Sequence, residues 1–186
     1  MNPEIILGPP GCGKTTALLS IVDEELARGT PPDRIAFVTF TRRAAEEAIS
    51  RAVEKFKLAR TAFPYFKTLH AHCYKQLGIR SGDVMNTNKL AEFGDFAGVK
   101  ITGRWSEDGT LNGFELGDRI LFMENLARVR MIPLRQQYDA DDDNLSWGTV
   151  DYVARSYAAW KEQKGLVDFT DMLLLYIKSG IQLKLD

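Results

Sequence analysis

The sequence of 186 residues contains few cysteines and histidines and no long apolar run. Its two cysteines, Cys12 and Cys73, are too few for a disulfide framework and favour a reducing environment. No stretch approaches the roughly 20 apolar residues of a membrane span, and residues 1–4 show no basic, then apolar, leader. The sequence also lacks internal repeats and low-complexity tracts. The composition therefore predicts a cytoplasmic protein without a membrane partner.

Charge is unevenly distributed although the net charge is only −1. Residues 42–80 hold nine Lys or Arg against three Asp or Glu, whereas residues 81–186 hold twelve against seventeen. A basic segment inside an acidic chain suits an anionic partner, although the same charges are also typical of a solvated helix face.

The first 78 residues alternate between apolar runs and amphipathic patterns. The apolar, β-branched runs predict buried strands at residues 4–7, 35–40 and 65–67. Helices are expected over 14–27, 42–56 and from the capping Thr68 to about residue 77. This order predicts an α/β fold in which right-handed crossovers connect a parallel sheet.

The pattern changes after Gly78. Residues 79–116 contain many turn signals and are expected to be irregular, and residues 139–144 read as an exposed acidic loop. Helices are predicted over 117–130, 150–163 and 169–178. Asp168 is expected to cap the last of these, and residues 181–185 resemble the start of a strand. Residues 79–164 therefore read as a mostly helical insertion into the sheet domain.

Residues 8–15 match the phosphate-binding pattern G-x-x-x-x-G-K-[ST] between a predicted strand and a predicted helix. The matching residues are Gly8, Pro9, Pro10, Gly11, Cys12, Gly13, Lys14 and Thr15. Glycines let the backbone N–H groups turn toward phosphate oxygens, and the helix N-terminus adds a positive dipole. Lys14 is expected to reach the β- and γ-phosphates of ATP, and Thr15 to ligate Mg²⁺. Cys12 reads as a small spacer within this loop.

Three further segments resemble motifs of superfamily 1 DNA helicases of the UvrD/Rep type. Residues 36–45 (AFVTFTRRAA) resemble motif Ia, and residues 67–73 (KTLHAHC) resemble motif Ib. Residues 164–174 (KGLVDFTDMLL) resemble the segment before the Walker B strand. All three follow the phosphate-binding loop in the family's order, so the resemblance spans the chain.

The resemblance implies an incomplete RecA-like domain 1A over residues 1–78 and 165–186, with residues 79–164 inserted as domain 1B. It implies ATP and Mg²⁺ as cofactors and single-stranded DNA as a partner. The residues that it places on the DNA path are Thr39, Phe40, Thr41, Arg42, Thr68, Leu69 and His70. An aromatic side chain at such a path stacks on any base, and hydroxyl and guanidinium groups hold phosphates. Core roles for Phe40 and His70 remain alternatives.

The sequence departs from the family pattern in three ways. No Gln-containing adenine motif precedes Gly8, and Thr16 stands where the family usually has Arg. No apolar strand ending in Asp-Glu follows Asp171, although hydrolysis needs such carboxylates together with an arginine finger. We therefore expect a fragment that binds nucleotide through Lys14, Thr15 and Thr16, hydrolyses it negligibly and needs missing C-terminal helicase domains.

Two other functions fit parts of the sequence. A small nucleoside or metabolite kinase would share the phosphate-binding loop and use Arg128, Arg130 and Arg135 on a mobile lid. A non-catalytic module that binds a partner chain under nucleotide control would share every feature of the helicase fragment. A zinc site at His70, His72 and Cys73 is disfavoured because no further ligand cluster accompanies it.

Overall fold

The chain divides into two compact units in the computed structural model, which describes residues 5–9, 11–105, 111–141, 143–183 and 185. Unit 1 comprises Met1–His72 and Gln182–Asp186, and unit 2 comprises Cys73–Ile181. The chain passes from unit 1 to unit 2 within helix α3 (Leu69–Gln76) and returns after Ile181. The units thus group residues 165–181 with the inserted segment, whereas the sequence assigned these residues to the sheet domain.

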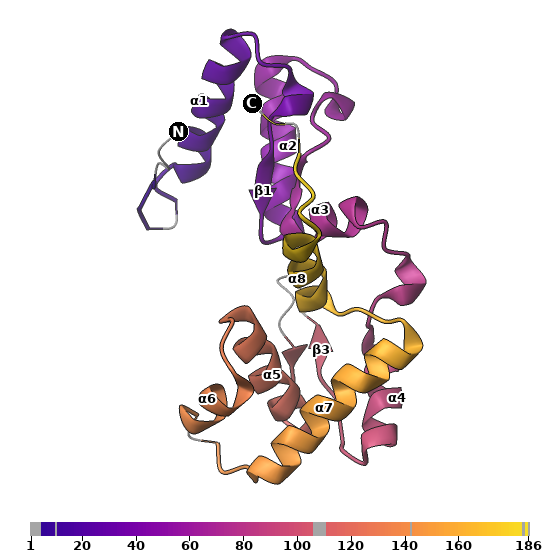
Figure 1. The fold of residues 1–186 in the computed structure, drawn as a ribbon. Coiled ribbons are helices and arrows are strands. Elements are labelled where there is room, and N and C mark those ends of the chain that lie inside the picture. Colours follow the sequence, from indigo (N-terminus) through magenta and orange to yellow (C-terminus); the bar gives the residue numbers. More distant parts are fainter. Residues whose placement is uncertain (1–4, 10, 106–110, 142, 184, 186) are drawn as a thin grey trace. The chain divides into compact units, whose positions relative to one another are not determined.

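Unit 1 contains a small parallel sheet and two longer helices, coloured from indigo to magenta in Figure 1. Its elements before α3 are α1 (Lys14–Ala27), η1 (Pro32–Arg34), β1 (Phe37–Thr39), α2 (Arg42–Phe56), η2 (Arg60–Ala62) and β2 (Phe66–Thr68). Strands β1 and β2 are parallel, with Phe37 opposite Phe66 and Thr39 opposite Thr68. Apart from the strand predicted at residues 4–7, the order of these elements and the parallel pairing are confirmed, which makes the chain an α/β protein.

Helix α2 packs against both strands and against α1. Its alanine- and isoleucine-lined face is buried, as the spacing of Ala45, Ala48, Ile49 and Ala52 predicts. The Thr41 hydroxyl accepts a hydrogen bond from the N–H of Ala44 at 3.2 Å and so caps the helix. The core between these elements consists of Leu19, Val22, Ile35, Ile49, Ala52, Phe63 and Phe66.

The prediction of a strand at residues 4–7 is wrong for the residues that the structure describes. Residues 5–9 form no strand, and the side chains of Ile5 and Leu7 are 78% and 86% exposed. An apolar run becomes a strand only where a neighbouring strand satisfies its N–H and C=O groups, and no described residue pairs with this one. The strand expected at residues 181–185 is likewise not formed in its described residues. The sheet of unit 1 therefore has two strands in the described chain and does not establish a RecA-like sheet.

Unit 2 is mostly helical. Its elements after α3 are η3 (Ser81–Asp83), α4 (Thr87–Ala97), β3 (Arg104–Trp105), β4 (Leu111–Asn112), α5 (Leu116–Val129), α6 (Leu134–Asp139), α7 (Trp147–Lys164) and α8 (Phe169–Ser179). Strands β3 and β4 pair antiparallel. The three helices predicted in this half of the chain are confirmed as α5, α7 and α8.

Helix α4 corrects the prediction that residues 79–116 are irregular. The Asn86 side chain accepts a hydrogen bond from the N–H of Lys89 at 3.0 Å, and Gly98 ends the helix in a left-handed conformation. Leu90, Phe93 and Ala97 recur at helical spacing and are buried in the core of unit 2. Asn86 and Gly98 are typical helix-capping residues, but the turn-forming residues around them led to the prediction of an irregular segment.

A buried group of charged side chains joins three helices of unit 2. Asp168 is fully buried, caps α8, and forms ion pairs of 2.7 Å with Nη2 of Arg128 and 2.6 Å with Nζ of Lys161. Asp171 pairs with the same two cations, and Glu124 pairs with Arg128 at 2.7 Å. The capping role predicted for Asp168 is confirmed. We call these five residues the buried ion cluster.

Among the helices of the described residues, none has the length and apolar character that crossing a membrane requires. Cys12 is exposed and Cys73 is buried, and both are free thiols. Burial raises the pKa of the Cys73 thiol, which keeps it in the neutral form.

Candidate functional site

The glycine-rich loop before α1 has the backbone conformation that its glycines allow. Gly11 and Gly13 have φ angles of 81° and 86°, in the left-handed region that other residues adopt at a cost. A side chain on Gly8 would collide with Sγ of Cys12. Pro10 lies outside the described residues. The backbone conformation at Gly11 and Gly13 therefore favours glycine, whereas a Cβ at Gly8 would require the Cys12 side chain to move.

The Lys14 side chain folds back over this loop. Its Nζ donates to the carbonyl oxygens of Gly8 at 2.7 Å and Pro9 at 2.6 Å, and it lies 3.6 Å from Sγ of Cys12. These two carbonyl oxygens and Sγ of Cys12 accept the three hydrogen bonds that hold the ammonium group against the loop. The arrangement places a positive charge beside the first turn of α1.

The N-terminus of α1 has no side-chain cap, because Gly13 stands at the N-cap position. No acidic residue occupies the first turn. The first N–H groups of a helix without a cap are free to bind an anion, and the helix dipole favours negative charge there. Thr15 and Thr16 follow directly in this turn, with Thr15 half-buried and Thr16 exposed.

A pocket in unit 1 brings the start of α1 together with the end of β1. Lys14 and Thr15 line it from α1, and Thr39 and Phe40 line it from β1 and the turn that follows. Further lining residues are Ile6, Leu18, Phe37, Val38, Ala44 and Glu47. Residues predicted to bind ATP and residues predicted to bind single-stranded DNA thus line the same pocket.

Sequence reasoning missed the contribution of α2 to this pocket. Ala44 and Glu47 lie three residues apart and so share one face of the helix. Glu47 forms an ion pair of 2.5 Å with Arg51 one turn further along. The helical spacing within residues 42–56 would have identified this face, but only the folded chain shows that it borders the pocket.

The residues predicted to bind DNA near β1 lie mostly at the surface. Phe40 is 71% exposed, which contradicts a core role for its ring. Thr41 and Arg42 are exposed, and the Thr39 hydroxyl donates to the carbonyl of Thr41 at 3.0 Å. This bond stabilises the turn that presents the Phe40 ring to solvent.

The second group of predicted DNA contacts lies deeper. Thr68 and His70 are buried, and Leu69 is half-buried. The Thr68 hydroxyl accepts a hydrogen bond from the N–H of Ala71 at 3.1 Å, so its predicted role as a cap is confirmed. Burial, together with the nearby charge of Lys67, lowers the pKa of His72, so this imidazole stays neutral at pH 7. Among the described residues, no group of three or more His, Cys, Asp or Glu is arranged to hold a metal ion.

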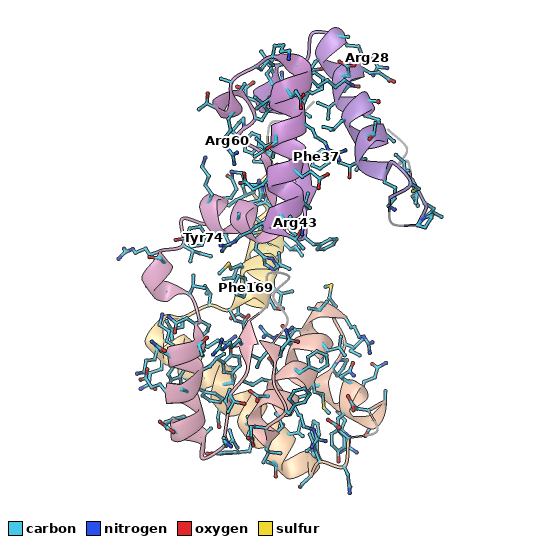
Figure 2. All side chains as sticks on the ribbon, turned by 180° about the vertical axis from the view of Figure 1, so that it is seen from behind. Arg28, Phe37, Arg43, Arg60, Tyr74 and Phe169 are labelled. Carbon is cyan, nitrogen blue, oxygen red and sulfur yellow. The ribbon has the colours of Figure 1, made fainter. Side chains whose placement is uncertain are left out.

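The positive charges of residues 42–80 include several exposed arginines. Figure 2 shows Arg43 at the start of α2 and Arg60 further along the chain. Arg60 is engaged by Glu46 at 2.6 Å, and Arg42 and Arg43 begin α2 two and three positions after Phe40. The part of the basic segment nearest the exposed aromatic ring is therefore the beginning of α2.

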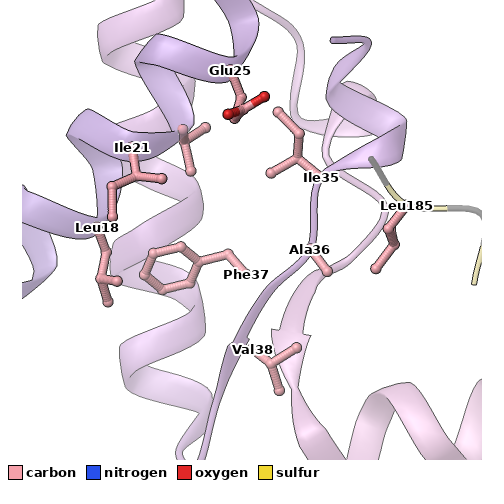
Figure 3. Close-up of a pocket in the computed structure, with 9 residues that line it drawn as sticks. Leu18, Ile21, Glu25, Ile35, Ala36, Phe37, Val38 and Leu185 are labelled. Carbon is pink, nitrogen blue, oxygen red and sulfur yellow. The ribbon is translucent and has the colours of Figure 1, made fainter. Parts of the chain in front are cut away.

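A second pocket in unit 1 is apolar. It lies between α1 and β1 and is lined mainly by Leu18, Ile21, Ile35, Phe37 and Leu185, as Figure 3 shows. Its polar lining is limited to the Glu25 side chain and backbone atoms, and it offers no cation for a phosphate. This pocket therefore does not compete with the start of α1 as an anion site.

The arginines proposed for a kinase lid are engaged elsewhere. Arg128 belongs to the buried ion cluster. Burial alone would lower its pKa, but the carboxylates of Asp168 and Glu124 outweigh burial and hold the pKa well above its usual range. Arg130 donates to Gln137 at 2.8 Å, and Arg135 pairs with Asp139 at 2.9 Å. Arg128 is thus buried and paired rather than available to a lid, and the structure does not support a kinase.

Comparison with known proteins adds one positive result. The sequence model of a family described as the UvrD/REP helicase N-terminal domain matches residues 1–183. No curated protein sequence matches the chain.

Proposed function

The chain belongs to the family of UvrD/REP helicase N-terminal domains, and from this premise we propose that it forms the ATP-binding and single-stranded-DNA-binding part of an ATP-dependent DNA helicase. The observation that carries the proposal is the shared pocket of unit 1, which joins Lys14 and Thr15 to Thr39 and Phe40. The family match supports the helicase assignment, and the pocket supports contact between the two ligand sites.

Under this proposal, residues 1–78 and 165–186 correspond to domain 1A and residues 79–164 to domain 1B. Helix α8 then belongs to domain 1A in the family's terms, although its N-terminus is held by the buried ion cluster to α5 and α7. The cluster gives a physical link between the inserted domain and the segment that returns from it.

The start of α1 suits the triphosphate of ATP. Its N–H groups without a cap would hold phosphate oxygens, and Lys14 would place its ammonium group on the β- and γ-phosphates. The Thr15 hydroxyl would ligate Mg²⁺, which neutralises charge on the phosphates when it is bound. The remaining loop residues, Gly8, Pro9, Pro10, Gly11, Cys12, Gly13 and Thr16, would shape this cradle.

The DNA path would run over the end of β1 and the beginning of α2. The exposed Phe40 ring would stack on a base, and Thr39, Thr41 and Arg42 would hold adjacent phosphates. The path would continue past the junction of β2 and α3, at Thr68, Leu69 and His70. Because the side chains of Thr68 and His70 are buried, they would act on DNA mainly by positioning the backbone there.

We expect the isolated chain to bind ATP but to hydrolyse it negligibly. Among the described residues, the carboxylate that lines the shared pocket is Glu47, which is paired with Arg51, and the pocket contains no arginine to stabilise transferring phosphate. Release of inorganic phosphate should stay at the level of a Lys14→Ala control, with or without single-stranded DNA. Turnover that rises with DNA and exceeds this control would contradict the expectation.

Replacing both Arg42 and Arg43 with alanine should weaken binding of a labelled single-stranded oligonucleotide and flatten its salt dependence. Each phosphate contact that is lost should reduce the slope of log K against log salt by about 0.7, because fewer counterions are released on binding. Fluorescence anisotropy at several salt concentrations, with and without a non-hydrolysable ATP analogue and Mg²⁺, measures both effects.

The matched control removes two arginines outside the path. Arg28 pairs with Glu25, and Arg60 pairs with Glu46, so their double alanine variant loses the same charge. An equal loss of slope in both variants would assign the effect to net charge alone and remove Arg42 and Arg43 from the DNA path.

A further inference from the structure

A groove in unit 2 exposes two aromatic side chains beside carboxylates. It lies between β4, α5 and the loop after α6, and Figure 1 shows α5 and α6 side by side. The side chains that matter here are Leu111, Phe114, Arg119, Phe122, Asp141 and Asp143. Phe114 is 97% exposed and Phe122 is 42% exposed. An aromatic ring so fully in water is unfavourable for an isolated unit and is typical of a recognition surface.

Phe114 is held in this exposed position by a rigid backbone. The carboxylate of Asp118 is almost fully buried and accepts hydrogen bonds from the N–H groups of Gly103 at 2.7 Å and of Thr102 and Glu115 at 3.1 Å. Gly113 has no room for a side chain, because a Cβ there would collide with the same carboxylate. These contacts hold the backbone on both sides of Phe114, whose ring lies in solvent.

The opposite wall of the groove is also preformed. Arg119 on α5 forms a two-point ion pair with Asp143, with Nη2 to Oδ1 at 2.6 Å and Nε to Oδ2 at 3.0 Å. The N–H of Asp143 donates to Asp141 at 3.1 Å, and the Tyr138 hydroxyl donates to the carbonyl of Leu145 at 2.8 Å. A surface that is ordered before binding loses little conformational entropy when a ligand arrives.

The charge of the groove selects the kind of ligand. Arg119 is neutralised by Asp143, which leaves Asp141 as an excess negative charge in the wall. The nearby Asp139 and Asp151 pair with Arg135 and Arg155, so the excess negative charge of the described groove is that of Asp141. This charge favours a cationic ligand over an anionic one, and the faces of the phenylalanine rings favour cations as well.

We propose that this groove binds a short segment of a partner protein in which a bulky apolar residue is flanked by lysine or arginine. The apolar side chain packs between Phe114 and Phe122, and a basic side chain lies against Asp141. Shape and charge then act together, since the aromatic pair supplies the anchor and the carboxylates supply selectivity. The proposal is independent of the nucleotide and DNA sites of unit 1.

A library of random peptides displayed on phage tests the proposal with the full 186-residue chain. Selection on the chain, with counter-selection on the Phe114→Ala variant, should enrich peptides that carry a large apolar residue between lysines or arginines. The enriched peptide should lose about tenfold or more in affinity for Phe114→Ala, as expected for an anchor residue. Its affinity for Asp141→Asn should fall, and the remaining binding should depend less on salt.

The control variant is Phe96→Ala, because Phe96 is another exposed aromatic residue, 61% exposed on α4 and outside the groove. Its affinity for the peptide should equal that of the unchanged chain. Phe114→Ala alters an exposed side chain, and Asp141→Asn keeps an oxygen that can accept the N–H of Asp143, so thermal melts should confirm that both variants remain folded.

Three results would overturn the proposal. The first is the absence of enriched peptides that distinguish the chain from Phe114→Ala. The second is concentration-dependent self-association that Phe114→Ala abolishes in sedimentation velocity, since the occupant would then be another copy of the chain. The third is loss of single-stranded DNA binding in Phe114→Ala, because the rings would then act as a stacking platform for bases.

Discussion

Replacing Lys14 with alanine is expected to lower the affinity for an ATP analogue by on the order of a hundredfold or more. The ammonium group would make charge-assisted hydrogen bonds to phosphate, each contributing about 1.5–3 kcal/mol, and about 1.4 kcal/mol corresponds to a tenfold change. Titration calorimetry in the presence of Mg²⁺ measures the loss. In the structure, Nζ of Lys14 donates to the carbonyls of Gly8 and Pro9 and to Sγ of Cys12, all within the glycine-rich loop, so the fold of unit 1 should survive the change.

Lys75→Ala is the matched control for this experiment. Lys75 is exposed in the last turn of α3 and lies outside the shared pocket, so its loss removes the same charge without touching the glycine-rich loop. Urea unfolding should give equal stabilities for both variants. An ATP affinity that is unchanged in Lys14→Ala would refute the assignment of this loop to phosphate binding.

Replacing Asp168 with alanine should destabilise unit 2 by about 3–5 kcal/mol, because the buried cations Arg128 and Lys161 lose the carboxylate between them. The change also removes the cap of α8, where the N–H of Asp171 donates to Asp168 at 2.8 Å. Asp151→Ala is the control, since its pair with Arg155 is exposed and such pairs contribute only about 0–1 kcal/mol. Urea unfolding compares the two, and equal effects would contradict the role of the cluster.

The pH dependence of stability gives the same cluster a second signature. Burial alone would raise the pKa of Asp168, but the charges of Arg128 and Lys161 outweigh it and hold this pKa well below its usual range. A carboxylate with a depressed folded-state pKa stabilises the protein above its unfolded pKa of about 3.9, and this stability is lost as the pH falls below that value. The stability of Asp168→Ala should therefore decline less steeply than that of the unchanged chain between about pH 5 and pH 2.

Local signals were sufficient for much of the fold. The glycine-rich loop, helices α1 and α2, and the caps at Thr41, Thr68 and Asp168 were all predictable, because each depends on residues within a few positions of one another. Helix α4 was missed, although Asn86 and Gly98 bound it, because its neighbours are rich in turn residues. The family resemblance was also readable from short motifs, and the match over residues 1–183 confirms it.

Other features depended on the folded chain. Whether residues 5–7 form a strand depends on a neighbouring strand, and no residue in the described part of the chain supplies one. The placement of Phe40 and Glu47 around one pocket with Lys14 requires that α1, β1 and α2 pack together. The exposure of Phe114 depends on Asp118, whose carboxylate gathers backbone groups from segments fifteen or more residues earlier.

The sequence by itself determined the chemistry available to this protein: a phosphate-binding loop, a basic segment that follows the aromatic Phe40, and most of its helices. The tertiary structure decided which of these groups meet and which are buried. It paired Arg128 with Asp168, forty positions apart, and left Phe40 and Phe114 in solvent. The physical reason is that burial and long-range ion pairs depend on the surfaces that different elements bury together, whereas helix caps and loop conformations depend on adjacent residues alone.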